Sequence, residues 1–223
     1  MLTNLVGVAH LFIICQINKE VKKMDFFTAD THFFHPGIVH NARFADRHFL
    51  TIGEMNEQIV NSWNATVAPT DQVYHLGDIA LISTKAAELA RLLSLLLRLN
   101  GNICFIKGNH DNQTLFKYLA KHNITVNGKP KFTFHEVGIR LKFAKYQFFL
   151  THYPMIVGPA KNRINLHGHI HNRAVNMAEN INVGVDSPEK DYLHRSIPFG
   201  TPFSRDDIVM MVTEKKIDYQ KRR

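Results

Sequence analysis

The chain has 223 residues and a mass of 25.6 kDa, and 45% of its residues are hydrophobic while 21% are charged. This length and composition suit one globular domain with a sizeable core, and they exclude the disordered, collagen-like and low-complexity classes. The formal net charge of +8 favours anionic partners such as phosphates, nucleic acid or an acidic membrane surface, without choosing among them.

Residues 1–23 come first in chain order, and their apolar run lacks the flanks of a signal peptide. No Lys or Arg precedes Leu5–Cys15, and no Ala-x-Ala-like site follows it. We interpret residues 1–23 as a leader or as a mis-assigned upstream extension, because Lys19–Val21 can be encoded by a bacterial ribosome-binding sequence ahead of Met24. We expect no membrane span and a cytoplasmic location, since no run of about 18 apolar residues and no disulfide framework occur.

From Met24 onward, short apolar runs alternate with helical patterns and predict one domain over residues 24–223. Most of the runs expected to be strands are continuous rather than alternating, which indicates burial on both faces of a sheet. These runs are Asp25–Ala29, Val73–Leu76, Ile103–Lys107, Gln147–Thr151, Ile164–His167 and Ile181–Val185.

Helices are expected between these strands and near the end of the chain. Thr51 and Glu54 form a capping-box pattern that begins one helix, and Lys85–Leu99 is a leucine-rich helical segment. Ser204 followed by Asp207 predicts a short capped helix.

The region before Gln147 has a different pattern. Lys131–His135 and Ile139–Phe143 are strand-like runs that precede the buried run at Gln147, and together they predict a meander. Two mixed sheets are therefore favoured over one parallel sheet.

Metal-capable side chains follow the predicted strands directly. Loops at the carboxyl ends of strands meet at one edge of an open α/β sheet, so five separate motifs can build one site. Asp, Asn and His donors suit Mn, Fe, Zn, Co or Ni, and seven donors are too many for one ion, so we expect two divalent ions that share Asp78. The motifs are Asp30-x-His32, Gly77-Asp78, Gly108-Asn109-His110-Asp111, His152 and Gly168-His169-Ile170-His171.

This motif series resembles that of the calcineurin-like metallophosphoesterase superfamily, whose pattern is matched in full and in order over Asp30–His171. The segments Asp30–His35 and Arg47–Phe49 also look like a small bacterial and phage branch of predicted phosphoesterases, in which a Pro usually occupies the position of His48. The resemblance implies an α/β (α+β) fold, a four-layer αββα sandwich of two mixed β-sheets flanked by helices.

The resemblance also implies a role for each motif residue. One ion would be held by Asp30, His32 and His171, the other by Asn109, His152 and His169, with Asp78 as the bridge. A hydroxide that bridges the two ions would attack phosphorus. His110 would be the general acid that protonates the leaving oxygen, and we expect Asp111 to orient its ring.

Four further residues neighbour the motifs and are candidate contacts to the phosphate or to the leaving group, namely His35, Arg47, Tyr153 and Arg173. His75 and His167 lie within predicted strands, so we expect them to be buried supporting histidines rather than ligands.

The leading hypothesis for function is a metal-dependent hydrolase that cleaves a phosphomonoester or a phosphodiester. Its substrate would be a phosphate ester, including nucleotides or nucleic acid. The alternatives are a metal-dependent nuclease and a non-catalytic binding module on the same fold. The sequence gives no sign of the oligomeric state.

Overall fold

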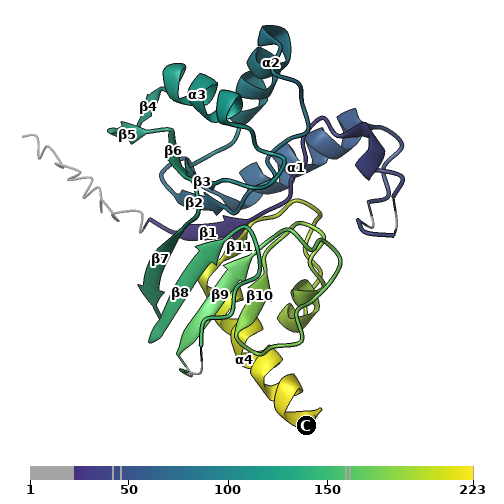
Figure 1. Cartoon of the computed structure of the whole chain (residues 1–223), viewed down its shortest axis with the longest axis vertical. Helices are drawn as coiled ribbons and strands as arrows, with labels where there is room; N and C mark the ends of the chain where they lie inside the picture. The colour runs from purple at the N-terminus through teal and green to yellow at the C-terminus, as the bar shows by residue number, and fades with distance from the viewer. Residues whose placement is uncertain (1–22, 42, 46, 159, 161, 223) are drawn as a thin grey trace, which may run out of the picture.

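The larger of two main sheets has five strands in the order β11-β1-β2-β3-β6, of which β1, β2, β3 and β6 run parallel and β11 runs antiparallel to β1 (Figure 1). The computed structural model describes residues 23–41, 43–45, 47–158, 160 and 162–222. The strands are β1 (Asp25–Thr28), β2 (Gln72–His75), β3 (Asn102–Ile106), β6 (Phe132–His135) and β11 (Phe203–Ser204).

The second sheet has four strands in the order β10-β9-β8-β7. β8 runs parallel to β9 and β9 runs parallel to β10, whereas β7 runs antiparallel to β8. Both sheets are therefore mixed. The strands are β7 (Gly138–Phe143), β8 (Tyr146–Thr151), β9 (Arg163–His167) and β10 (Asn180–Asn182), and β4 (Thr125–Val126) with β5 (Lys129–Pro130) forms a separate small ribbon.

Three helices cover the first sheet on the side away from the second sheet (Figure 1). The first of them begins at Thr51, whose hydroxyl oxygen accepts a hydrogen bond from the backbone N–H of Glu54. Its buried face carries Met55, Ile59 and Trp63 at helical spacing. These helices are α1 (Ile52–Thr66), α2 (Ala86–Leu96) and α3 (Gln113–Lys121), and short 3₁₀ turns occur at η1 (Pro36–Ile38) and η2 (Pro188–Leu193).

The last helix, α4 (Arg205–Lys221), packs along β11, β1 and β10 and lies behind β9 and β10 in Figure 1. It begins with a complete capping box, in which the Ser204 hydroxyl accepts from the Asp207 N–H and the Asp207 carboxylate accepts from the Ser204 N–H. The expected cap is confirmed, but the helix has 17 residues and is not short.

Two apolar clusters explain the layers. Phe26 on β1 joins the cluster under α1, α2 and α3, whereas its neighbour Phe27 joins the cluster between the sheets, with Phe148 of β8, Leu166 of β9 and residues of α4. Alternate residues of one strand are thus buried on opposite faces, which is why the adjacent residues Phe26 and Phe27 are both apolar. The predicted arrangement of two mixed sheets flanked by helices is confirmed.

The predicted meander over residues 131–151 is confirmed for its last two strands, which pair antiparallel, and is wrong for its first strand. β6 pairs in parallel with β3 in the first sheet, whereas β7 pairs with β8 in the second. The reason lies in the two clusters, because Phe132 packs under the helices while Ile139 and Leu141 pack between the sheets.

Two further expectations concern residues 1–23 and membrane-spanning helices. The interpretation of residues 1–23 as a leader or extension falls, apart from residue 23, outside the described residues. Among the helices that the structure describes, none combines the length and the apolar character that crossing a membrane requires.

Candidate metal centre

The predicted ligands lie together because their strands end at the same edge. The β1–β2–β3 register aligns Thr28 with His75 and His75 with Phe105, so the motifs that follow these residues begin at one level. An isolated bridge between Ala29 and Gly184 joins the end of β1 to the segment after β10. The loops after β8 and β9 in the second sheet therefore face those of the first.

Five of the seven predicted ligands have a left-handed backbone conformation that residues other than glycine rarely adopt. Their φ angles are +57° at Asp30, +48° at His32, +56° at Asp78, +73° at His169 and +49° at His171. Such conformations each cost about 1–3 kcal/mol and concentrate at functional sites. The chain turns sharply at these positions, and the turns direct the side chains into a common centre.

Two glycines in the motifs allow this close approach. A Cβ atom at Gly108 would lie 2.3 Å from the Asp78 carboxylate oxygen, and one at Gly168 would lie 2.7 Å from a carboxylate oxygen of Asp30. Real Cβ atoms do not approach other atoms so closely, so both positions require glycine.

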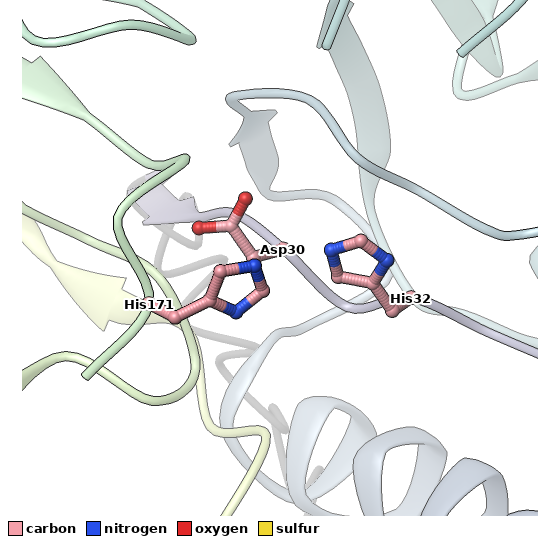
Figure 2. Close-up of side chains that lie close together, drawn as sticks. All are labelled: Asp30, His32 and His171. Carbon is pink, nitrogen blue, oxygen red and sulfur yellow. The ribbon is translucent and has the colours of Figure 1, made fainter. Parts of the chain in front are cut away.

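The first ligand group consists of Asp30, His32 and His171, whose donor atoms all lie within 4.8 Å of one another (Figure 2). Asp30 and His32 come from the segment after β1, and His171 comes from the segment after β9. All three are buried, with 0%, 0% and 3% of their surface exposed. We refer to them as the enclosed group.

A buried ion pair supports the enclosed group. The Arg47 guanidinium donates to both carboxylate oxygens of Asp186 and to the backbone carbonyls of Asp30 and Thr31. Asp186 in turn lies 3.0 Å from Nδ1 of His171. With a proton on Nδ1, the lone pair of Nε2 in the same ring is available to a metal ion. The charge of Arg47 and its hydrogen bond, together with that from His171, outweigh the effect of burial and hold the pKa of Asp186 below its usual value.

The structure corrects the assignment of Arg47 as a substrate contact. Arg47 is 2% exposed, and the whole of its guanidinium is engaged by protein groups, so it holds the ligand loop in place instead. Asp186 was not among the predicted site residues. The available signal was its position directly after the strand-like run Ile181–Val185, where the other motifs also occur.

The second ligand group consists of Asp78, His152 and His169, again with donor atoms within 4.8 Å of one another. The side-chain oxygen of Asn109 lies 2.9 Å from both His152 Nε2 and His169 Nδ1 and completes the set. His152 Nδ1 lies 2.8 Å from the Leu76 carbonyl oxygen, so a proton on Nδ1 leaves Nε2 unprotonated and directed inward. Asn109 is exposed and His169 is half-buried, and we refer to these four residues as the open group.

Asp78 belongs to the open group and also borders the enclosed group. Its Oδ2 is 3.5 Å from His32 Nε2 of the enclosed group and 3.5 Å from His152 Nε2 of the open group. Its Oδ1 accepts the backbone N–H of His110 at 2.8 Å, which fixes the direction in which the carboxylate points. This position is the one expected of a shared ligand.

Burial dominates the electrostatics of the centre. Burial and the nearby Asp78 carboxylate raise the pKa of Asp30 well above its usual value. Burial also lowers the pKa of His32, of His152 and of His169, and for His32 the charge of Arg47 acts in the same direction. These three imidazoles are therefore neutral at pH 7, as metal ligation requires.

These residues fit divalent metal ions. His32 Nε2 is buried without a hydrogen-bond partner among the described residues, although it faces the other donors of the centre. A buried nitrogen lone pair with no partner is unfavourable unless something else binds it. Carboxylate, amide and imidazole donors together match Mn, Fe, Zn, Co or Ni.

His110 lies at the open side of the centre, with 39% of its side chain exposed and Nε2 4.0 Å from Asp78 Oδ2. The expectation that Asp111 orients the His110 ring is wrong. Both carboxylate oxygens of Asp111 accept backbone N–H groups, from Asp78 and Gly108 on one oxygen and from Ile79 on the other. Asp111, whose pKa burial raises to about 7, therefore holds the two motif loops together.

The other predicted substrate contacts lie at different depths. The His35 ring is half-buried beside His32, with 3.3 Å between their Nδ1 atoms. Tyr153 is 52% exposed, and its ring packs edge-on against His169 with 4.6 Å between centroids. Arg173 is exposed.

His75 and His167 are buried within their strands, as expected. His75 Nε2 lies 2.9 Å from the hydroxyl of Thr31, the residue between Asp30 and His32 in the sequence. His167 Nδ1 lies 2.9 Å from the Gly168 carbonyl oxygen. Burial lowers the pKa of His75 to about 3 and that of His167 to about 4.

Residues 27–185, which include all seven predicted ligands, match the family described as the calcineurin-like phosphoesterase superfamily domain. The chain belongs to this superfamily. It is also similar to an uncharacterised protein of Methanocaldococcus jannaschii, with 42% identity over 86 residues that make up 39% of this chain. This match covers 46% of the archaeal protein's length.

Two solved structures resemble this member of the superfamily to different extents. A protein of unknown function from Aquifex aeolicus has a TM-score of 0.58 and 21% identity over 84% of this chain and 98% of that one, which shows a shared fold. The match to an archaeal phosphodiesterase covers 73% of this chain and 83% of that one at 19% identity, but its TM-score of 0.36 is too low to show a shared fold. The family and the two ligand groups together indicate a phosphoesterase-superfamily protein with a candidate dinuclear metal site.

Proposed function

We propose that this chain is a metal-dependent phosphoesterase that hydrolyses a phosphomonoester or a phosphodiester at the centre between its sheets. The observation that carries the proposal is that the enclosed and open groups meet at one oxygen, Asp78 Oδ2. Two ions that share a carboxylate lie about 3.5–4 Å apart, a spacing that clamps both the attacking and the leaving oxygen of a phosphoryl group. Since each group draws ligands from both sheets, the proposal treats residues 24–223 as one functional domain.

The proposed mechanism assigns tasks to the chain's own residues. When bound, the two ions would lower the pKa of a water molecule and neutralise charge that develops on the phosphate. Asp78 would be a ligand to both ions, and His152 and His171 are fixed in orientation by the Leu76 carbonyl and by Asp186.

His110 is the proposed general acid. Its ring is exposed at the open side and lies 5.2 Å from the His32 ring, centroid to centroid, but its nitrogens belong to neither ligand group. A protonated His110 can therefore give its proton to the leaving oxygen of the ester. The position of His110 supports this role. Among the described residues, Asp78 Oδ2 lies within 4.0 Å of ring nitrogens of His32, His152 and His110, and His110 is the one of these three that is not a candidate ligand.

The test compares wild type with Asp78→Asn, each supplied with Mn²⁺. Substrates are bis-p-nitrophenyl phosphate, p-nitrophenyl phosphate and 2′,3′-cyclic nucleotides, and metal content is measured on the same samples. Asp206→Asn, an exposed carboxylate at the start of α4, is the matched control. Turnover that the control retains and Asp78→Asn loses, together with bound metal, supports the proposal.

Absence of turnover in wild type with Mn, Fe, Zn, Co or Ni would contradict the proposal and favour a binding module. The preferred ester separates a monoesterase from a diesterase. A nuclease would be recognised by the salt dependence of substrate binding, because many phosphate contacts make binding fall steeply with ionic strength.

A further inference from the structure

A cavity of about 330 Å³ lies beside the open group. It is bounded by the segment after β8, which begins with the candidate ligand His152, and by the connection between β6 and β7. Its volume falls at the lower end of the range of about 300–1,000 Å³ for small-molecule sites. The lining residues are Lys107, Glu136, Val137, Thr151, His152, Tyr153, Pro154 and Met155.

The walls of this cavity are mainly apolar and open to water. Val137 is 80% exposed and Tyr153 is 52% exposed, although both are large hydrophobic side chains, and Pro154 and Met155 complete the same wall. Exposed apolar side chains that gather around a concave surface next to a reaction centre are typical of a ligand site.

The charges at the rim exclude a second phosphate as the occupant. The ammonium of Lys107 lies 3.0 Å from a carboxylate oxygen of Glu136 and 3.3 Å from the side-chain oxygen of Gln113. Lys107 and Glu136 therefore neutralise each other, and among the described residues no other Lys or Arg lines the cavity. A neutral apolar group gains by entering, whereas an additional anion finds no unpaired cation among these lining residues.

The cavity is close enough to the metal centre for one substrate to reach both. His152 lines the cavity and is also a ligand of the open group. The Tyr153 ring lies edge-on to the rings of both His152 and His169, at 5.1 Å and 4.6 Å between centroids. An ester whose phosphate lies between the ions would therefore extend its organic group past Tyr153.

We propose that this cavity, which we call the Tyr153 cavity, binds an uncharged aromatic group of the phosphate ester, with Tyr153 as the residue that selects it. The proposal rests on the proposed function for the position of the phosphate. An aromatic ring suits the cavity because Tyr153 and Val137 offer flat and branched apolar surfaces, and aromatic pairs gain energy beyond the area that they bury.

The first experiment measures binding without turnover. Benzylphosphonate and methylphosphonate, whose carbon–phosphorus bonds resist hydrolysis, are titrated by calorimetry into the Mn²⁺-loaded protein. We expect benzylphosphonate to bind at least about tenfold more tightly, which corresponds to burial of one phenyl ring. Tyr153→Ala and Val137→Asp should abolish most of this preference, which is the ratio of the two affinities within one variant, whereas Tyr153→Phe should retain it.

The control is Ile217→Ala, a half-exposed apolar side chain on α4 outside the cavity, which should behave as wild type. Equal affinity of wild type for the two phosphonates would overturn the proposal. So would a preference for benzylphosphonate that survives both Tyr153→Ala and Val137→Asp.

The second experiment separates this proposal from the proposed function. The esters are phenethyl phosphate and ethyl phosphate, with the corresponding methyl diesters, so that the alcohols differ in the ring and little in acidity. We expect a lower KM for the phenethyl esters and a rise in that KM of about tenfold in Tyr153→Ala, with kcat little changed. Turnover without a lower KM for the phenethyl esters overturns the proposal for the Tyr153 cavity and leaves the proposed function intact. Absence of turnover with a retained benzylphosphonate preference overturns the proposed function alone.

Discussion

The enclosed group and the open group use the same kinds of donor but have different surroundings. Asp30, His32 and His171 are buried and are backed by the Arg47–Asp186 pair, whereas the open group includes exposed Asn109 and borders the Tyr153 cavity. The difference indicates a division of labour. Under the proposed function, the enclosed side would depend on the stability of the fold, and the open side would be where a substrate enters and where His110 acts.

The largest expected effect tests the open side. His110→Ala should lower turnover of an ester with a poor leaving group by about 10²–10⁴-fold, because a general acid contributes that much. Metal content, measured on the same protein, should stay unchanged, since His110 is in neither ligand group. His122→Ala, an exposed histidine after α3, is the control. Unchanged turnover in His110→Ala would remove this residue from the mechanism.

The next effect tests the enclosed side. Arg47→Met leaves the carboxylate of Asp186 buried without its cation, so the free energy of unfolding should fall by about 3–5 kcal/mol. Glu57→Gln breaks the exposed pair with Arg98 and should cost about 1 kcal/mol or less. Urea denaturation of the metal-free proteins measures both. Similar losses in the two variants would mean that burial does not distinguish these pairs.

A smaller effect should be confined to one of the two ions. Asp186→Asn weakens the hydrogen bond that orients His171, and changes of this kind cost about 10–100-fold in metal affinity. We expect chelator competition to show one weakened site and one unchanged site, at a temperature where circular dichroism shows the variant folded. Equal weakening of both sites would contradict the separation into two groups.

The smallest effect concerns His75, which supports Thr31 beneath the enclosed group. The folded chain holds the pKa of His75 at about 3, whereas the unfolded chain protonates this residue below about 6.5. Its contribution to stability is therefore lost as the pH falls through 6.5 toward 3, at about 1.4 kcal/mol per pH unit. Asp111, with its pKa raised to about 7, changes stability in the opposite direction over part of this range, so a comparison of proteins is needed.

His75→Phe isolates that contribution. Relative to wild type, this variant should gain about 1.4 kcal/mol in the free energy of unfolding for each unit by which the pH falls from about 6 to 4.5. Urea denaturation of the metal-free proteins at three pH values provides the measurement. Parallel stability curves for the two proteins would show that His75 is not held neutral.

The sequence predicts most of the strands and the candidate ligands that the structure brings together in two groups, because each motif is local and follows its own apolar run. Asp30 and Asp78 are recognisable from their immediate neighbours alone. The partner of Arg47 cannot be recognised in this way, since Asp186 is 139 residues away and only the docking of the two sheets brings the two residues together. For the same reason Arg47 reads as a substrate contact in the sequence, although the fold buries it.

The assignment of strands to sheets fails for a similar reason. β6 and β7 are close in sequence, and their apolar patterns do not say which cluster each will join. The role of Asp111 is also hard to predict from the sequence. Its sequence neighbour is His110, but its carboxylate accepts hydrogen bonds from the backbone of another loop, at Asp78 and Ile79.

The long separation between ligands has a consequence for how the chain reaches its final state. The Asp30 carboxylate accepts the backbone N–H of His169, 139 residues later, so neither ligand group exists until both sheets have formed and docked. Contacts of such long range form slowly during folding. Ions that bind only the docked state pull the equilibrium toward it. A nascent chain that stops before His169 has been synthesised lacks donors of both groups. Under the proposed function, metal uptake would therefore distinguish finished molecules from unfinished ones.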